Sequence, residues 1–444
     1  MVLELADIQG SILRGYSFGR AIHLFVAFPD ARAGRRWLAS IAGQVQTAEG
    51  WQQRPDTAVN VALTYAGLRL LGAGDEDLPE ALREPMAERA ETTLGDDLST
   101  WRRGLGDGRA HALLLLAGDG FAFASRLKAL RALADEHGLQ TVFEQRAQML
   151  PDQREHFGFA DGFGQPAVEG TDKRRAGQGE PDEYGSWRDL KAGEFVHGYP
   201  DEDGQTEDAP LLRNGSFMVY RKLEQDVERF RRYLDREADH YCATAGVNHG
   251  TSAATAHAYA RELIAAKLIG RWRDGVAVEL APERDPDEAH ALRHTSVEKP
   301  DNDFRYADDG DGRRCPVGAH VRRANPRDSA RLTAQARRHR IIRRGIPYTD
   351  RDACGLVFIC FNASFERQFE TVQRRWCDDG NAFGLGRDQD VLFASHAGSG
   401  KVTIPGDPPH FARAEPGLVT TRGCEYLLMP GLRALRDLAQ GGGR

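Results

Sequence analysis

The sequence predicts an α+β protein made of two related ferredoxin-like domains, each an antiparallel sheet covered by helices. A strand–helix–strand order occurs twice before residue 150, and the same order returns after residue 215 with longer insertions. This doubled order is the ferredoxin-like arrangement. The chain of 444 residues is long enough for two large domains, or for about three units of roughly 150 residues. We expect domains at 1–205 and 206–444, because residues 171–210 are rich in glycine, proline and charge, as a connection should be.

Hydrophobic periodicity defines the elements of the first half. Residues 21–28 form an apolar run typical of a buried strand, and residues 59–65 alternate between apolar and polar side chains. Two other stretches repeat apolar residues at helical spacing, with Trp37 and Ile41 in the first and Leu127 and Leu130 in the second. The expected strands are therefore 21–28, 59–65, 110–117 and 140–147, and the expected helices are about 33–45 and 122–136.

The second half repeats this order. A strand at 216–220 is followed by a helix whose apolar face is marked by Leu223, Val227, Phe230 and Leu234. Further strands are expected near 338–343, 355–361 and 426–429, and a helix at about 364–377. The polar stretch 282–313 predicts a solvated loop.

Composition and charge exclude several classes of function. Lys plus Arg number 59 and Asp plus Glu 66, so the net charge is −7 and gives no overall attraction to nucleic acid or an anionic membrane. No apolar run approaches the ~18 residues of a membrane span, and the N-terminus lacks a signal core, which predicts a cytoplasmic location. The six cysteines are scattered without a CxxC pair, so we expect free thiols.

Three segments contain residue types that carry chemistry. Residues 158–166 surround Asp161 with glycines, although such an aspartate alone is more typical of a turn than of a catalytic acid or base. Small residues around His320 leave room for a flat ligand, although a satisfied polar histidine is the commoner interpretation. Arg343 belongs to a basic run, 331–344, that alone would indicate a solvated face or a phosphate-binding patch.

Taken together, these segments resemble the dye-decolourising peroxidase family. Its signature is matched by the GxxDG loop from Gly158 to Gly162, the Gly-Ala-His-Val-Arg-x-x-Asn-Pro-Arg context of His320, and the Ile-x-Arg-x-x-x-Pro-Tyr context of Arg343. Further similar stretches make the resemblance cover most of the chain. It implies two ferredoxin-like domains of the dimeric α/β-barrel type, one haem b in the C-terminal domain, and the larger cytoplasmic branch without an export leader.

The resemblance also implies roles for single residues. His320 is expected to ligate the haem iron, with Asp390 accepting a hydrogen bond from its second ring nitrogen; Asp388, two residues away, stays open as an alternative. Asp161 is expected to move a proton during peroxide cleavage, and Arg343 to stabilise the charge on the leaving oxygen. Which of these two matters more is left open.

Other residues are expected around the haem. Arg327 would neutralise a propionate, and Leu356 and Phe358 would flank the distal cavity, with plain strand core as the alternative for both. Arg344 should point away from the haem, since neighbours on a strand face opposite sides. Trp376 and Tyr348 are candidate surface residues for electron transfer from large dyes.

The implied activity is that of a haem peroxidase, in which hydrogen peroxide oxidises dyes, phenols and similar small aromatic reductants through a ferryl-oxo intermediate. No nucleic acid or membrane is expected as a partner, and a monomer or homodimer is expected. A haem-binding or iron-releasing protein on the same scaffold is the main alternative; it would need His320 but not Asp161 and Arg343 together. Nucleic-acid binding through the arginines of 321–344 is opposed by the net charge of −7.

Overall fold

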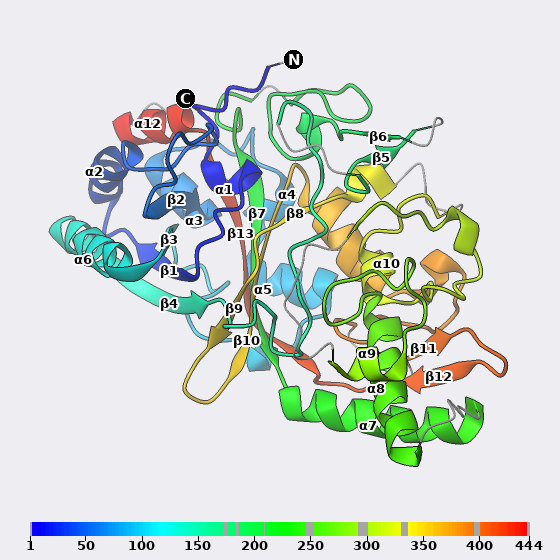
Figure 1. The fold of residues 1–444 in the computed structure, drawn as a ribbon. Helices are drawn as coiled ribbons and strands as arrows, with labels where there is room; N and C mark the ends of the chain where they lie inside the picture. Colours follow the sequence, from blue (N-terminus) through cyan, green and yellow to red (C-terminus); the bar gives the residue numbers. More distant parts are fainter. Residues whose placement is uncertain are drawn as a thin grey trace.

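One antiparallel sheet runs through the protein (Figure 1). The computed structural model describes residues 2–171, 176–182, 186–207, 209–245, 252–291, 301–329, 336–394 and 400–441. The strand order is β4-β1-β3-β2-β13-β7-β10-β8, and β9 pairs with β10. The first four strands have the ferredoxin-like order, and β13-β7-β10-β8 repeats it with later strands. The two ferredoxin-like units therefore share one sheet, joined where Leu63 of β2 pairs with Leu428 of β13.

The N-terminal unit packs two longer helices against its strands. Its strands are β1 (Arg20–Ala27), β2 (Thr57–Leu63), β3 (Ala112–Gly118) and β4 (Gln140–Gln148), and its helices are α1 (Gly10–Leu13), α2 (Ala31–Ala42), α3 (Tyr65–Leu71), α4 (Glu80–Arg83), α5 (Met86–Arg89), η1 (Ala90–Leu94), η2 (Leu98–Thr100) and α6 (Gly120–Glu136). The final helix, α12 (Leu432–Gln440), returns to this unit and packs beside α2, where Figure 1 shows the red and dark blue helices together.

The C-terminal unit contains long insertions between its strands. The segment before it holds β5 (Glu180–Pro181), β6 (Trp187–Arg188) and η3 (Ala192–Glu194). Its strands are β7 (Ser216–Gln225), β8 (Ile342–Arg343), β9 (Ile346–Thr349), β10 (Cys354–Asn362) and β13 (Val419–Met429). The helices and the inserted hairpin are α7 (Val227–Ala245), α8 (Ala253–Ile269), α9 (Pro286–Ala291), η4 (Ala307–Asp309), α10 (His320–Ala324), η5 (Arg337–His339), η6 (Phe365–Cys377), η7 (Gly380–Phe383), β11 (Lys401–Ile404) and β12 (His410–Arg413).

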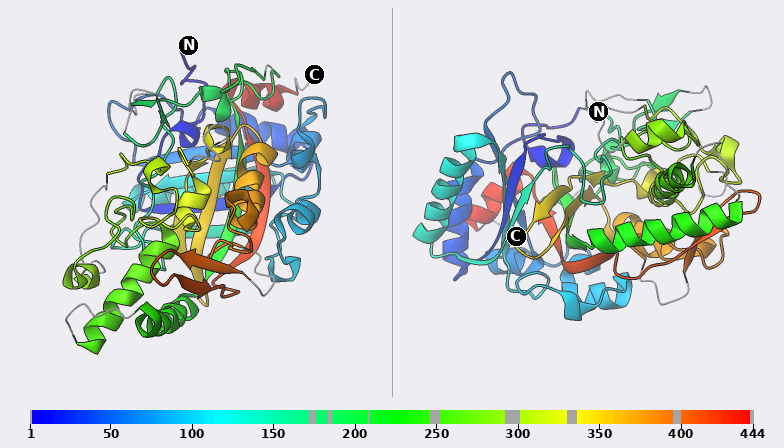
Figure 2. Two further views of the ribbon diagram at one scale, coloured as in Figure 1. Left: turned by 90° about the vertical axis from the view of Figure 1, so that its right-hand side faces the viewer. Right: turned by 60° about the horizontal axis from the view of Figure 1, so that its bottom comes forward.

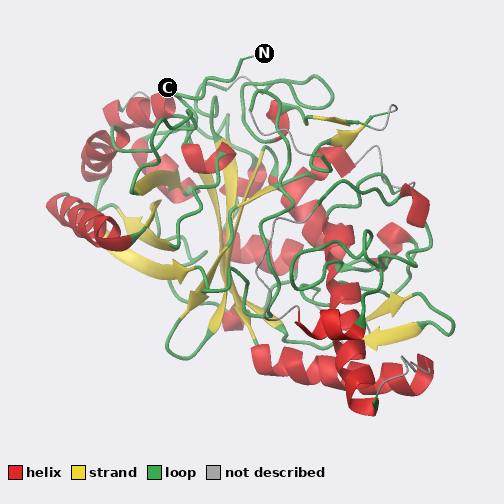
Figure 3. Cartoon of the chain, viewed as in Figure 1, coloured by secondary structure: helices red, strands yellow, loops and turns green. Residues whose placement is uncertain are grey.

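Successive side chains along each strand point to opposite faces of the sheet, and each face packs against its own hydrophobic core. On β7, Phe217 and Val219 join a core with Trp37 of α2 and Phe365 of η6. Their neighbour Met218 faces the other core, which contains residues from α1 and from the 190–199 loop. Figure 3 shows the helices gathered on both sides of the central strands. The sheet thus leaves one face of β7 and β10 open to the large C-terminal insertions.

Several expected element boundaries were wrong. Leu223 belongs to β7 and not to a helix: it pairs with Leu356 of β10 and Thr421 of β13, and α7 begins only at Val227. The strand expected near 338–343 is a short helix, η5, followed by β8. Helix α8 was missed because residues 263–269 are buried without a break, so no polar stripe marks its period.

The polar stretch is largely solvated where the structure describes it, as expected, with Asp285, Asp301 and Asp311 exposed. The arginines that precede the basic run are instead buried. Arg322 is buried and paired with Asp309 at 2.9 Å, and Arg323 donates to the carbonyl oxygens of Trp376 and Asp388. Residues 292–300 of the polar stretch, and 330–335 with Arg331 of the basic run, lie outside the described residues. Arg322 and Arg323 therefore bind groups of the protein interior.

The cysteines are free, as expected. Within the part of the chain that the structure describes, no helix has the length and apolarity to cross a membrane.

Candidate active site

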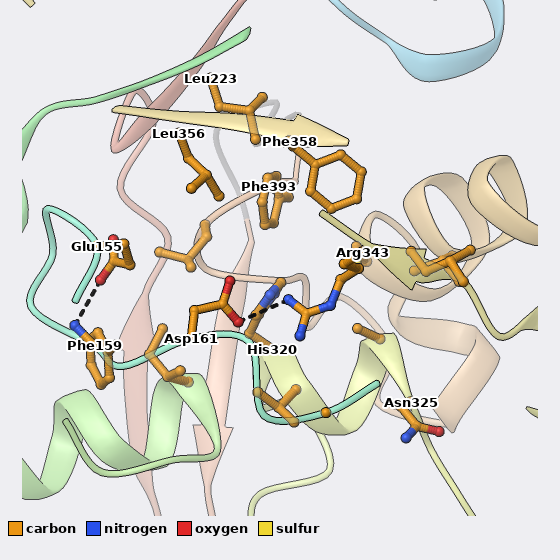
Figure 4. Close-up of a pocket in the computed structure, with 18 of the residues that line it drawn as sticks. Glu155, Phe159, Asp161, Leu223, His320, Asn325, Arg343, Leu356, Phe358 and Phe393 are labelled. Atoms are coloured by element: carbon orange, nitrogen blue, oxygen red, sulfur yellow. Dashed lines mark hydrogen bonds and ion pairs between the residues drawn. The ribbon is translucent and has the colours of Figure 1, made fainter. Parts of the chain in front are cut away.

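The three chemical segments meet at one cavity beside β7 and β10. Asp161, His320 and Arg343 all line it, together with Leu356 and Phe358 (Figure 4). Each comes from a different element: Asp161 from the loop after β4, His320 from the first residue of α10, and Arg343 from β8. Only the tertiary structure brings them together, because the first and last of them are separated by 182 residues in the chain.

The imidazole of His320 is held from one side. Its Nδ1 lies 2.8 Å from Oδ2 of Asp390, whose Oδ1 accepts the backbone N–H groups of Leu392 and Phe393. Burial opposes ionisation of Asp390, but the charge and hydrogen bond of His320 outweigh it, so the pKa of Asp390 is lowered. A charged Asp390 fixes a proton on Nδ1 and leaves Nε2 of His320 as the nitrogen with a free lone pair.

The alternative carboxylate, Asp388, is engaged elsewhere. Its Oδ1 lies 2.6 Å from Nζ of Lys401, and its Oδ2 accepts the backbone N–H of Thr403 at 2.8 Å. Of the two candidates, only Asp390 contacts His320.

Asp161 and Arg343 form a pair inside the cavity. Nη1 of Arg343 lies 3.1 Å from Oδ1 of Asp161, which also accepts the N–H of Gly162 at 2.6 Å. Burial raises the pKa of Asp161, but the Arg343 charge and the Gly162 hydrogen bond outweigh burial and hold it below its usual range. Gly158 and Gly162 both have φ near +90°, at 93° and 91°, a conformation that explains why this loop needs glycine.

Gln165 connects the Asp161 loop to the strand of Arg343. Its Oε1 accepts the backbone N–H of Arg343 at 3.0 Å, and its Nε2 donates to the Arg343 carbonyl oxygen at 3.1 Å. Sequence reasoning missed this residue, since a glutamine beside a glycine loop has no pattern of its own. Arg344 turns the other way and donates to the carbonyl oxygens of Ser11 and Ile12, as strand alternation predicted.

The sequence of this chain is similar to those of known peroxidases. A family profile described as "Dyp-type peroxidase, C-terminal" matches residues 267–406. The dye-decolorizing peroxidase msp1 of Mycetinis scorodonius is 27% identical, with 98% of this chain and 88% of that protein covered. The multifunctional dye peroxidase DyP2 of Amycolatopsis is 29% identical over 98% of this chain and 96% of its own length.

Solved structures agree with these matches. A fungal DyP-type peroxidase from Auricularia auricula-judae has a TM-score of 0.82 at 24% identity, covering 99% of this chain and 100% of its own. An ancestral D-type dye decolorizing peroxidase also gives 0.82, at 26% identity and the same coverage. Over nearly its whole length the chain is thus similar to dye-decolourising peroxidases, and residues 267–406 match the C-terminal profile of that family.

These matches support a haem-dependent peroxidase, and the cavity fits that cofactor on independent grounds. Leu356 and Phe358 are two residues apart on β10, so their side chains point to the same face of the sheet and both line the cavity. Leu223 lies opposite Leu356 on β7. These side chains, with Phe369 of η6, provide the apolar wall that a porphyrin requires.

Three buried arginines line another part of the same cavity, and no carboxylate among the described residues forms an ion pair with them. Arg327 donates to the carbonyl oxygens of Asn302 and Phe304, Arg271 to the Asn302 side chain and the Gly275 carbonyl, and Arg340 to the carbonyl of Gln178. Burial lowers the pKa of Arg327 to about 9 and that of Arg340 to about 10. Uncompensated buried cations are costly, so this wall fits an anionic group such as a haem propionate.

Arg327 shows a further sign of constraint. Its φ is +49°, which a side chain with a Cβ rarely adopts, and its guanidinium lies 3.7 Å from the centroid of the Phe304 ring. Sequence reasoning identified Arg327 through its spacing from His320. Arg271 was missed because it lies near no recognisable motif, and Arg340, three residues before Arg343, was assigned only to the basic run.

Two expectations about surface electron transfer were wrong. Trp376 is 3% exposed and Tyr348 is 0% exposed, so neither is a surface residue. Trp376 packs in the interior against His339 and Phe383.

Proposed function

We propose that this peroxidase holds haem b through His320 and uses hydrogen peroxide to oxidise phenols and dyes. The observation that carries the proposal is the shared cavity: a histidine backed by a carboxylate, a carboxylate–guanidinium pair and an apolar wall all face it (Figure 4). When bound, haem supplies a redox-active iron that takes up oxidising equivalents from peroxide and passes them on to reductants.

His320 would be the axial ligand through Nε2. Asp390 holds the proton on Nδ1 and its negative charge makes the imidazole a stronger electron donor. Arg327 would pair with a propionate, and Leu356 and Phe358 would border the peroxide side of the porphyrin.

Asp161 would act as the proton carrier. Oδ1 is already bound by Arg343 and Gly162, so Oδ2 is the atom that accepts a proton from bound peroxide and returns it to the departing oxygen. The lowered pKa of Asp161 keeps this carboxylate ionised and able to accept that proton.

Arg343 would stabilise the departing oxygen. Its guanidinium stays charged at every physiological pH and offers five donors, of which one contacts Asp161. A fixed cation next to the proton carrier lets the O–O bond break unevenly, with the charge on the leaving oxygen neutralised as it forms.

Small phenols are the expected reductants. A solved structural neighbour of 24% identity is a dye-decolorizing peroxidase in complex with 2,6-dimethoxyphenol, and its TM-score is 0.83. We therefore choose this phenol, together with an anthraquinone dye, as the assay substrates.

The test is a peroxide titration of the purified holoenzyme, followed by its Soret absorption and by phenol oxidation. We expect rapid spectral change and turnover in the parent, and slow change in Asp161→Ala and Arg343→Leu. If both variants react with peroxide as quickly as the parent, the roles given to these two residues are wrong.

A second candidate, iron release from haem, has one observation in its favour. Two Yersinia proteins named deferrochelatase are 36% identical to this chain over 76 residues, or 16% of its length. Free iron and intact porphyrin after incubation with haem, without peroxide-dependent phenol oxidation, would support this candidate over the peroxidase.

We also propose a domain division at 205/206, a cytoplasmic location, and a monomer or homodimer in solution. The division is supported by the strand order, since β4 ends the first ferredoxin-like set and β7 begins the second.

A further inference from the structure

A second cluster of metal-binding side chains lies where α7 meets the β11–β12 hairpin. Glu237 and His240 of α7 and His410 of β12 each place one ligand atom within 4.8 Å of the others. None of the three lines the cavity of His320. We propose that they bind one divalent transition-metal ion of the zinc type, which fastens the hairpin to α7.

The spacing of the ligands suits such an ion. Glu237 and His240 are three residues apart on a helix and therefore share a face. His410 pairs with Ile404 at the turn end of the hairpin, and β12 packs against α7. Figure 2 shows the orange-red hairpin beside the green helices α7 and α8. Two imidazoles and one carboxylate are a donor set typical of zinc with a fourth position left for water.

The distances are close to those of a metal centre. Nε2 of His410 lies 3.0 Å from Oε2 of Glu237, and the rings of His240 and His410 have centroids 5.1 Å apart. Bonds of about 2.0–2.2 Å to a tetrahedral ion place its ligand atoms roughly 3.3 Å from one another. The Glu237–His410 pair is already near that spacing, and a rotation of the exposed His240 side chain would complete it.

Two buried polar atoms at this place lack a partner among the described residues. His410 is 3% exposed, and its Nδ1 is buried without a hydrogen bond. The hydroxyl of Tyr233, one helical turn before Glu237, is buried and unpaired as well. Native proteins rarely leave such atoms unsatisfied, and water bound to an ion on Nε2 of His410 would supply a partner for the Tyr233 hydroxyl.

An ion here would support the loop behind His320. Lys401 and Thr403 of the same hairpin hold Asp388, and Asp390 lies two residues further on. Fixing the free end of the hairpin to α7 should therefore stabilise the folded protein, although the ion takes no part in peroxide chemistry.

The test uses untagged, chelator-treated holoenzyme titrated with Zn²⁺ by calorimetry at pH 7.5. We expect one equivalent to bind with micromolar or tighter affinity and to raise Tm. His240→Ala and Glu237→Gln should each weaken binding by ~10-fold or more and remove the increase in Tm; the side chain of His240 is exposed, so the fold should survive its removal.

His257→Ala is the matched control, because His257 lies on the neighbouring helix α8 and contacts Asp239, next to His240 in sequence. We expect its affinity for Zn²⁺ to match that of the parent. Binding weaker than millimolar in the parent, unchanged affinity in His240→Ala or Glu237→Gln, or an equal loss in His257→Ala would each overturn the proposal.

Discussion

Asp161 is kept in its charged form by its neighbours, and this decides how the enzyme should respond to acid. Arg343 and the Gly162 N–H both bind Oδ1 and overcome the effect of burial on the Asp161 pKa. The folded protein therefore keeps the carboxylate ionised below the ordinary aspartate pKa of 3.8. Proton transfer by Asp161 should be available above that lowered pKa and be lost as the pH falls through it.

Replacement of Asp161 by asparagine should lower kcat/KM for peroxide by ~10²–10⁴-fold, since a positioned proton carrier contributes about that factor. The acid limb of the rate profile, which should lie below pH 3.8 in the parent, should vanish in the variant. Stopped-flow absorption between pH 3 and 7 measures both effects. Asp352→Asn, an exposed aspartate on the turn between β9 and β10, is the control; an equal loss there would refute the assignment.

Replacement of Asp390 by asparagine should weaken the electron donation of His320, because an amide cannot place a negative charge on the Nδ1–H. We expect the reduction potential of the bound haem to rise and the peroxide reaction to slow by ~10–100-fold, as for other partners of metal-ligating histidines. Redox titration and stopped-flow kinetics measure the two changes. An unchanged potential would mean that the Asp390 charge does not act on the iron.

At the level of elements, the site depends on how β8 is held against the Asp161 loop. β8 has only two residues, Ile342 and Arg343, and it pairs with β10 through Phe361 and Cys360. Gln165 adds two hydrogen bonds to the backbone of Arg343 from the other side. A strand this short has few ladder bonds of its own, so the glutamine helps to fix the backbone from which the Arg343 guanidinium reaches Asp161.

Gln165→Ala removes both bonds and should destabilise the protein by about 1–3 kcal/mol, taking roughly 0.5–1.5 kcal/mol for each. Because Arg343 would lose its fixed position, we also expect kcat/KM for peroxide to fall while the Soret band is retained. Denaturant unfolding and steady-state kinetics on the same preparation separate the two effects. Full activity in a destabilised variant would show that Arg343 is positioned by other contacts.

At the level of the whole molecule, β13 connects the two ferredoxin-like units, with β2 on one side and β7 on the other. Glu425 of this strand is buried, and its Oε2 accepts the N–H of Gly106 from the N-terminal unit at 3.0 Å. Burial raises the pKa of Glu425 to about 8, with the nearby Asp107 acting in the same direction. The junction between the units therefore contains a carboxyl group that is protonated at neutral pH.

This group makes stability depend on pH. Between its ordinary pKa of 4.5 and about 8, the folded chain holds a proton that the unfolded chain has released, so stability should fall as the pH rises through this range. The slope is roughly 1.4 kcal/mol per pH unit for a single group. In Glu425→Gln, which keeps an acceptor oxygen for Gly106, the free energy of unfolding should vary less between pH 5 and 8. Identical pH profiles for parent and variant would exclude Glu425 as the source.

The sequence by itself determined the fold class, and it pointed to Asp161, His320 and Arg343, which line one cavity. The periodicity of strands and helices follows local burial, so the ferredoxin-like order of elements could be predicted from the sequence. The motifs around Asp161, His320 and Arg343 could be found because each of them is a continuous stretch of chain. The same local view misassigned Leu223 and missed α8, because the side of a strand or helix that is buried depends on partners far away in sequence.

Only the tertiary structure decided the contacts between distant segments. It paired His320 with Asp390 rather than Asp388, set Gln165 against Arg343, gathered Arg271, Arg327 and Arg340 around one cavity, and joined Glu237, His240 and His410. Most of these contacts span a long stretch of chain. Hydrogen bonds and ion pairs act over a few ångströms in space, and a sequence pattern does not encode which distant residues come within that range.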